Sequence, residues 1–209
     1  MKIEKNIKNN QLLFVTATNT DVGKSYACEQ LLRKYAKEGY KVGYIKPIET
    51  GVITEPLDGG KLLDVVKELN PEFTLEINDV VPYQFELPAA PFVAKKSTEI
   101  DLEYIQSKIA LAQKQCEVLI VEGAGGLMVP IEKDFFIIDL IKILQCKAVL
   151  IAPSNLGSIN DTMLSIQALE AKKIPFEWYI NLYKDKESFE EVTLPFYKAY
   201  FGDIQYINE

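Results

Sequence analysis

The stretch Ala17-Thr18-Asn19-Thr20-Asp21-Val22-Gly23-Lys24-Ser25 follows an apolar run over residues 12–15 and precedes a helical pattern that reaches residue 38. This order predicts a strand, a loop and a helix. A loop that cradles phosphates needs small residues that let backbone N–H groups turn inward, a lysine for the β and γ oxygens, and a hydroxyl for Mg²⁺. Gly23, Lys24 and Ser25 supply the glycine, the lysine and the hydroxyl. We interpret the stretch as a phosphate-binding loop.

The match to the standard phosphate-loop spacing is partial. Thr18 stands where that spacing has glycine, and the nearest small residue is Ala17. The alternative is a chance Gly-Lys-Ser at a helix start, since glycine and serine are common caps. The apolar strand before the loop and the amphipathic helix after it favour phosphate binding. A hydrolase, a kinase, a ligase or an ATPase switch could each use such a loop.

Composition indicates one ordinary globular domain over residues 1–209, with residues 1–11 as a polar extension. The chain has 209 residues, of which 48% are hydrophobic and 25% charged, and its net charge of −7 argues against nucleic-acid binding. No apolar stretch is long enough to span a membrane, and residues 1–11 lack the apolar centre of a signal peptide. We therefore expect a cytoplasmic protein that binds no membrane. Cys28, Cys116 and Cys146 lack the spacing of a zinc site and are expected to be buried thiols.

Two absences restrict the chemistry. The chain has no histidine, which excludes histidine triads and histidine-ligated metals. Arg33 is the only arginine and falls inside the first predicted helix, away from its phosphate-facing end. Lysines and Mg²⁺ must therefore neutralise any phosphate charge.

The rest of the chain alternates strands and helices. Apolar runs predict further strands at residues 42–45, 118–121, 148–152 and 178–182. Helical spacing predicts further helices at residues 61–70, 101–115, 136–144, 158–172 and 188–200. Residues 54–60 are predicted to be a loop, and the proline-containing segment 71–96 is expected to be mostly irregular and to line a site or an interface. The alternation indicates a single-domain α/β fold, with a parallel sheet covered by helices on both faces.

Polar residues at predicted strand ends are candidate site residues, because ligands bind at the carboxyl edge of open α/β sheets. Glu122 follows a strand directly, and the glycines behind it favour a metal-binding carboxylate over a solvated strand end. Lys46, before Pro47, is equally compatible with a site residue and with a lysine that extends to solvent. Gly157-Ser158 could bind an anion at a helix start, but capping by the serine is the better-supported alternative.

Four segments together resemble the dethiobiotin synthetase family. They are Thr18 to Ser25, Lys46-Pro47-Ile48-Glu49-Thr50-Gly51, Val121-Glu122-Gly123-Ala124-Gly125-Gly126 and Asn155-Leu156-Gly157-Ser158-Ile159-Asn160. The resemblance covers residues 12–182, and the order and spacing of the four segments make it specific. It implies a P-loop NTPase-like fold and a homodimeric, Mg²⁺-dependent ligase. Such an enzyme closes the ureido ring of dethiobiotin from 7,8-diaminononanoate, CO₂ (or bicarbonate) and ATP in biotin biosynthesis.

The resemblance also implies residue roles. Lys24 and Lys46 would be catalytic, and Ser25, Asp64 and Glu122 would hold Mg²⁺. Nucleotide binding would fall to Asp21, Val22, Gly23, Lys24, Ser25, Tyr26, Glu122, Gly123, Ala124, Gly125 and Asn181, the last of which would contact the purine. Substrate binding would fall to Thr20, Lys46, Thr50, Gly157, Ser158, Ile159 and Asn160, with the last four supplied by the partner subunit.

Several alternatives stay open. Asp58 also precedes a helical run and competes with Asp64 as the metal carboxylate. The chain ends at Glu209, where the family usually continues into a segment that contacts the nucleobase, so we expect ATP to be favoured over other nucleotides by roughly tenfold or less. A partition-type ATPase switch would share the phosphate loop but carries a second lysine where this chain has Asn19. A related ATP-dependent amide-forming ligase is the other alternative.

Overall fold

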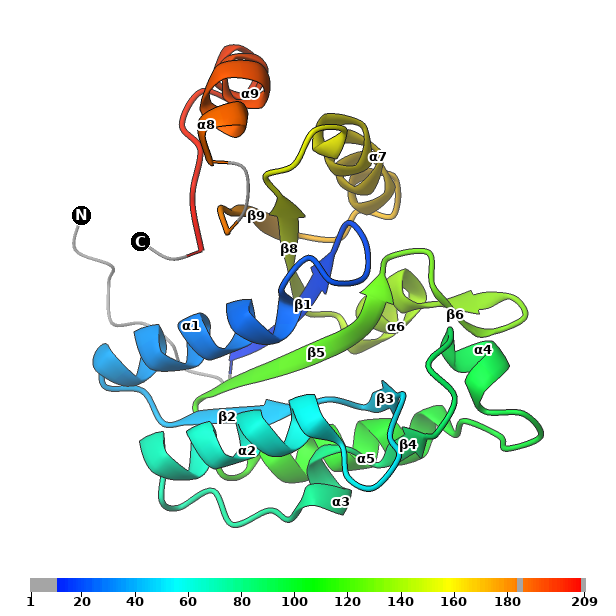
Figure 1. The fold of residues 1–209 in the computed structure, drawn as a ribbon. Helices are drawn as coiled ribbons and strands as arrows, with labels where there is room; N and C mark the ends of the chain where they lie inside the picture. The colour runs from blue at the N-terminus through cyan, green and yellow to red at the C-terminus, as the bar shows by residue number, and fades with distance from the viewer. Residues whose placement is uncertain (1–10, 184–185, 208–209) are drawn as a thin grey trace.

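The computed structural model describes residues 11–183 and 186–207. Its centre is a sheet of five strands in the order β2-β5-β1-β8-β9, in which every pair of neighbours is parallel. The five strands are β1 (Gln11–Ala17), β2 (Val42–Ile45), β5 (Val118–Gly126), β8 (Lys147–Pro153) and β9 (Phe176–Asn181). Helices pack on both sides of this sheet (Figure 1), so the predicted α/β fold is confirmed.

The strands are apolar along most of their length because they are covered on both faces. Leu119, Ile120 and Val121 of β5 and Val149 and Leu150 of β8 are fully buried. A parallel sheet sandwiched between helices offers no solvated face, so the strands show continuous apolar runs rather than alternation. These runs are the signal that located the strands in the sequence.

Five helices cover the sheet: α1 (Lys24–Lys37), α2 (Leu57–Leu69), α5 (Leu102–Gln113), α6 (Ile137–Leu144) and α7 (Ser158–Ala171). All five were predicted, but α2 begins four residues earlier than expected. The glycines at positions 59 and 60 suggested a loop, whereas these residues form the first turn of α2. The reason lies in a carboxylate outside the helix, described below.

The segment 71–96 contains short regular elements that the sequence did not predict. They are α3 (Ile77–Val80), β4 (Tyr83–Phe85) and α4 (Pro91–Ala94). Strand β4 pairs in parallel with β3 (Ile48–Thr50), which follows β2 directly. A second small pair, β6 (Pro130–Glu132) with β7 (Phe135–Phe136), is antiparallel and follows β5. The two small sheets flank the carboxyl ends of the central strands (Figure 1).

The last part of the chain forms a separate small core beside β9. The predicted helix 188–200 comprises α8 (Lys186–Ser188), a π-helical turn η1 (Phe189–Thr193) and α9 (Leu194–Phe201). Phe189 and Tyr197 are fully buried there, and the ring of Trp178 from β9 lies against Tyr197. The chain then returns to the sheet, where the backbone N–H of Ile180 donates to Gln205 (2.9 Å).

Other expectations about the chain can be assessed on the described residues. The three cysteines are buried and free, as predicted. In the described ranges no helix is long and apolar enough to cross a membrane. The expected polar extension lies outside the described residues except for Gln11, which is already the first residue of β1.

Candidate functional site

A cleft of about 680 Å³ opens at the carboxyl ends of β1, β5 and β2. Its lining comes from the phosphate-binding loop, from Lys46 and β3, from the end of β5 and from the segment 88–91. The strand order explains this convergence, because β2, β5 and β1 are neighbours in the sheet. Segments far apart in the sequence therefore meet at one edge. The proline-containing segment lines the cleft, as expected.

The phosphate-binding loop joins β1 to α1 and is held by its neighbours. Gly23 is the N-cap of α1 and has a φ of 93°, a conformation that favours glycine. A Cβ there would lie 2.2 Å from Asn181 Nδ2, so the backbone at Gly23 and the Asn181 side chain are in close contact. Gly23 has no side chain that could cap α1, so within the described residues the N-cap leaves the first N–H groups of the helix available to an anion in the cleft.

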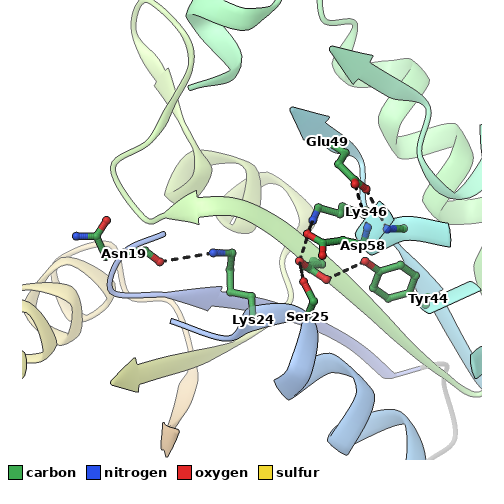
Figure 2. Close-up of polar contacts among 9 residues, drawn as sticks. Asn19, Lys24, Ser25, Tyr44, Lys46, Glu49 and Asp58 are labelled. Atoms are coloured by element: carbon green, nitrogen blue, oxygen red, sulfur yellow. Dashed lines mark hydrogen bonds and ion pairs between the residues drawn. The ribbon is translucent and has the colours of Figure 1, made fainter. Parts of the chain in front are cut away.

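Lys24 lies along this loop with its Nζ 3.5 Å from the carbonyl oxygen of Asn19 (Figure 2). The side chain is buried, and this burial lowers the pKa of Lys24, although Glu122 opposes the shift. A single backbone contact of 3.5 Å compensates only weakly for the loss of hydration of this ammonium group. Phosphate oxygens would supply the missing negative charge.

Glu122 is the centre of the polar cluster. Its carboxylate is 1% exposed and accepts three hydrogen bonds from side chains. Oε1 accepts from the Ser25 hydroxyl (2.8 Å) and from Lys46 Nζ (3.0 Å), and Oε2 accepts from the Tyr44 phenol (2.8 Å). Figure 2 shows these donors converging from α1, from β2 and from the residue that follows β2. The alternative of a solvated strand end is therefore wrong.

Lys46 bridges two carboxylates. Its Nζ lies 2.6 Å from Asp58 Oδ2 as well as 3.0 Å from Glu122 Oε1. Burial acts to lower the pKa of Lys46, but Glu122, Asp58 and Glu49 outweigh it and raise that pKa. Its side chain is only 7% exposed. Lys46 is therefore a buried, paired cation and does not extend to solvent.

The two candidate metal carboxylates, Asp58 and Asp64, lie in different places on α2. Asp58 lies in the first turn of α2 and lines the cleft, whereas Asp64 is exposed and does not line it. Six residues of α-helix rotate a side chain through about 600°, so Asp64 projects from a different side of α2. Of the two candidates that the sequence left open, Asp58 is therefore the one that lines the cleft, and the expected position of Asp64 at the site is wrong. Burial acts to raise the pKa of Asp58, but Lys46 reverses this and the net effect lowers it.

Oxygen atoms of Ser25, Asp58 and Glu122 are the candidate metal ligands. Across residues 11–183 and 186–207, no group of three or more His, Cys, Asp or Glu residues is arranged to hold a metal ion. Two carboxylates and a hydroxyl can hold Mg²⁺ together with phosphate oxygens and water. The site thus fits a cation that arrives with a nucleotide.

The other predicted residues fall into three groups. Thr20, Asp21, Tyr26, Thr50, Gly123, Ala124 and Gly125 line the cleft. Asn181 ends β9 beneath the loop, where its Nδ2 donates to the Val22 carbonyl (2.9 Å) and its buried Oδ1 has no hydrogen-bond partner in the described part of the chain. Residues 157–160 begin α7 and do not line the cleft. Gly157, with a φ of 92°, is the N-cap of α7. The expectation that the Ser158 side chain caps this helix is therefore wrong.

Tyr44 and Glu49 are residues of the cluster that the sequence did not predict. Tyr44 is fully buried in a short apolar strand, where it looked like an ordinary core aromatic. Glu49 was quoted only as part of a motif, yet it is buried and lines the cleft. The available signal was a carboxylate between Ile48 and Thr50, directly after Lys46-Pro47.

A glycine-lysine-serine loop between a buried strand and a helix, at the edge of a parallel sheet, defines a P-loop NTPase. A family model described as an AAA domain matches residues 11–187. The fold is similar to the MinD cell division protein of Aquifex aeolicus (TM-score 0.53, 16% identity, 94% of this chain and 80% of that chain). It is equally similar to a ParA family ATPase of Chlorobium tepidum (TM-score 0.54, 14% identity, 94% and 82%).

Sequence similarity is much higher to one kind of enzyme. An ATP-dependent dethiobiotin synthetase of Sulfurovum sp. is 50% identical over 90% of both chains. Its counterpart in Wolinella succinogenes is 36% identical over 89% of this chain and 88% of the relative. The chain belongs to the ATP-dependent dethiobiotin synthetase family.

Proposed function

We propose that this chain closes the ureido ring of dethiobiotin from 7,8-diaminononanoate, CO₂ and ATP, as a cytoplasmic enzyme of biotin biosynthesis. The observation that carries the proposal is the placement of two buried lysines, Lys24 and Lys46, at the phosphate end of one cleft, beside Asp58 and Glu122. This arrangement positions charge around a transferred phosphoryl group without histidine or arginine.

The reaction proceeds in three steps. One substrate amine adds to CO₂ and loses a proton, which gives a carbamate. A carbamate oxygen attacks the γ-phosphorus of ATP, and ADP leaves with the bond electrons. The second amine then attacks the carbonyl carbon of the mixed anhydride and loses a proton, phosphate leaves with the electrons of the C–O bond, and the five-membered ring is closed. The protein's task is to hold the reacting groups in line and to stabilise the developing charge.

Lys24 and Lys46 have separate roles in this proposal. Lys24 continues from the phosphate-binding loop and binds the β and γ phosphates. Lys46 comes from the end of β2 and acts on the carbamate oxygen and the transferred phosphoryl group. Thr20 and Thr50 line the same cleft and contact the diamine region.

Mg²⁺ would be held by Ser25, Asp58 and Glu122, and when bound it would neutralise phosphate charge. The fit of these residues to a cation is supported by Lys46, whose ammonium lies between Asp58 and Glu122 at hydrogen-bond distance from both. A cation already occupies the space between the two carboxylates. Lys46 must therefore exchange its carboxylate partners for substrate oxygens when the metal binds.

Nucleotide recognition is proposed to combine the loop with Asn181. Backbone N–H groups from Asp21 to Tyr26 and the glycine-rich end of β5 surround the phosphates. Asn181 Oδ1 is a buried acceptor without a partner among the residues that the structure describes, which suits the exocyclic amine of adenine. The expected weak selectivity among nucleotides stays a prediction.

The substrate carboxylate is proposed to bind at the start of α7 in a second copy of the chain. Gly157, Ser158, Ile159 and Asn160 do not line their own cleft, so within one subunit they are not placed to contact the substrate. The exposed side chains of Leu156 and Leu164 at this helix would be covered in a homodimer.

The test is an assay for ADP release by the purified protein with 7,8-diaminononanoate and bicarbonate, with the organic product identified by mass spectrometry. We expect ADP and dethiobiotin in equal amounts, and neither without the diamine. ADP release that instead depends on DNA or on lipid vesicles would identify a partition-type switch. ADP release that depends on another acid would identify an amide-forming ligase.

A further inference from the structure

Glu49 lies in β3 and reaches across to the start of α2. Its Oε1 accepts the backbone N–H of Asp58 (3.1 Å) and its Oε2 accepts that of Gly59 (2.9 Å), as Figure 2 shows. Both carboxylate oxygens are thus engaged by the first turn of one helix. The residue is 6% exposed, so this contact is made away from bulk water.

Helix α2 has no other cap among the contacts described. Its N-cap position is Pro56, which offers no side-chain oxygen, and no side chain of its own makes a capping bond. The first N–H groups of a helix need acceptors, and a carboxylate there also interacts favourably with the helix dipole. Glu49, which lies in β3, supplies both the acceptor oxygens and the negative charge at this helix end.

The backbone at Gly59 is shaped to receive the carboxylate. A Cβ at this position would lie 2.2 Å from Val81 Cγ2 and 3.0 Å from Glu49 Oε2. Only glycine therefore lets the first turn of α2 approach this closely. The two adjacent glycines that made the sequence look like a loop include the one that permits the contact.

The contact between Glu49 and the first turn of α2 also involves Asp58, the proposed metal ligand. Asp58 is bonded through its N–H to Glu49 and through its Oδ2 to Lys46 (2.6 Å). We propose that Glu49 is a positioning residue, which holds the first turn of α2 so that the Asp58 carboxylate faces Glu122 across the cation position. The inference rests on the proposed metal role of Asp58.

The test compares Glu49→Ala and Glu49→Gln with Asp58→Asn and with the control Glu55→Gln, which changes an exposed carboxylate just before α2. The first measurement is the Mg²⁺ concentration that half-saturates ATP binding, by calorimetry. The second is amide hydrogen exchange at residues 57–60. Neither depends on ring closure, so failure of the proposed reaction leaves the inference testable.

We expect Glu49→Ala to raise the half-saturating Mg²⁺ concentration by about tenfold or more, the usual effect of removing a partner of a metal ligand. Exchange at residues 57–60 should accelerate, and excess Mg²⁺ should restore kcat to within about threefold of the parent. Glu49→Gln keeps one acceptor oxygen, so its Mg²⁺ requirement and its exchange rate should lie between those of the parent and those of Glu49→Ala. Asp58→Asn should raise the Mg²⁺ requirement without changing exchange, and Glu55→Gln should match the parent.

Three results would overturn the inference. If Glu49→Ala keeps both the parent Mg²⁺ requirement and the parent exchange rate, Glu49 does not position Asp58. If excess Mg²⁺ does not restore kcat while exchange is unchanged, Glu49 acts on the substrate directly. An unchanged Mg²⁺ requirement in Asp58→Asn alone would remove the metal assignment of Asp58, and the inference with it.

Discussion

Tyr44 determines how Glu122 presents its carboxylate. The phenol holds Oε2, so that Oε1 is the oxygen directed at Ser25 and Lys46. Desolvation raises the pKa of Tyr44 well above its ordinary value, and Glu122 adds to the shift, so the phenol stays a donor. A buried hydroxyl of this kind acts on the site through the carboxylate it orients.

Tyr44→Phe tests this role, because it deletes one hydroxyl and leaves a buried carboxylate oxygen without its donor. We expect the free energy of unfolding to fall by roughly 1–3 kcal/mol and the Mg²⁺ requirement for ATP binding to rise. Urea denaturation and calorimetry measure the two effects. Tyr200→Phe, at an exposed tyrosine of α9, is the control and should change neither. An unchanged unfolding midpoint in Tyr44→Phe would contradict the argument.

Because we propose that Lys24 and Lys46 carry the phosphate-facing charge, Lys24→Ala and Lys46→Ala should each lower the rate of ring closure by at least about 10²-fold. Both lysines are buried. Lys46→Ala should therefore also destabilise the protein by roughly 1–3 kcal/mol, because Glu122 loses its counter-charge. Steady-state assays and urea denaturation measure these effects. Lys61→Ala removes an exposed ion pair with Glu29 and should retain activity.

The sequence could predict that the two lysines, Glu122 and the phosphate-binding loop lie at one site, because their residue types and order are specific. It could not decide between Asp58 and Asp64. That choice depends on where α2 begins, and the start is set by Glu49, eight residues before Leu57. Spacing along one segment does not reveal a cap that another segment supplies.

At the scale of elements, the phosphate-binding loop depends on contact with β9. Gly23 and Asn181 touch, and Asn181 donates to Val22 within the loop. The Tyr183 hydroxyl, two residues on, donates to the Asp21 carbonyl (3.1 Å). The end of β9 therefore supports the shape of the loop from outside through Asn181 Nδ2, and the side-chain oxygen of the same residue is the atom that we propose contacts the nucleotide.

Gly23→Ala should abolish ATP binding, because a methyl group would displace Asn181 and strain a backbone with positive φ. Gly39→Ala is a matched control, since Gly39 has nearly the same φ (92°) but nothing within 4 Å of an added Cβ. Both variants should lose roughly 1–2 kcal/mol of stability from backbone strain. Only Gly23→Ala should lose ATP affinity in a calorimetric titration. Equal ATP affinity in the two variants would show that the contact with Asn181 is not needed for binding.

For the whole molecule, the sequence predicted strands, helices and a parallel sheet but not the strand order. Apolar runs report burial of each strand and carry no information about its neighbours. The order β2-β5-β1 is what brings Lys46, Glu122 and the loop together. The small sheet of β3 and β4 was also missed, because three-residue strands are too short for a periodic signal.

The last prediction concerns the complete active site, which we propose needs two copies of the chain. The start of α7 lies outside the cleft of its own subunit, and Leu156, immediately before this helix, is 75% exposed. Burying such a leucine in an interface is favourable, and placing a charge there is costly. Leu156→Glu should therefore weaken the dimer and, with it, ring closure. ATP binding should survive, because the phosphate-binding loop, Lys46, Asp58 and Glu122 all come from one subunit.

Sedimentation and calorimetry separate the two effects. We expect Leu156→Glu to sediment as a monomer at concentrations where the parent is a dimer, and to lose ring closure in proportion to the monomer fraction. Gln106→Glu adds the same charge at an exposed position of α5 and should remain an active dimer. Since activity that depends on association rises with protein concentration, the variant should recover at high concentration. A Leu156→Glu monomer with full activity at low concentration would show that one chain contains the whole site.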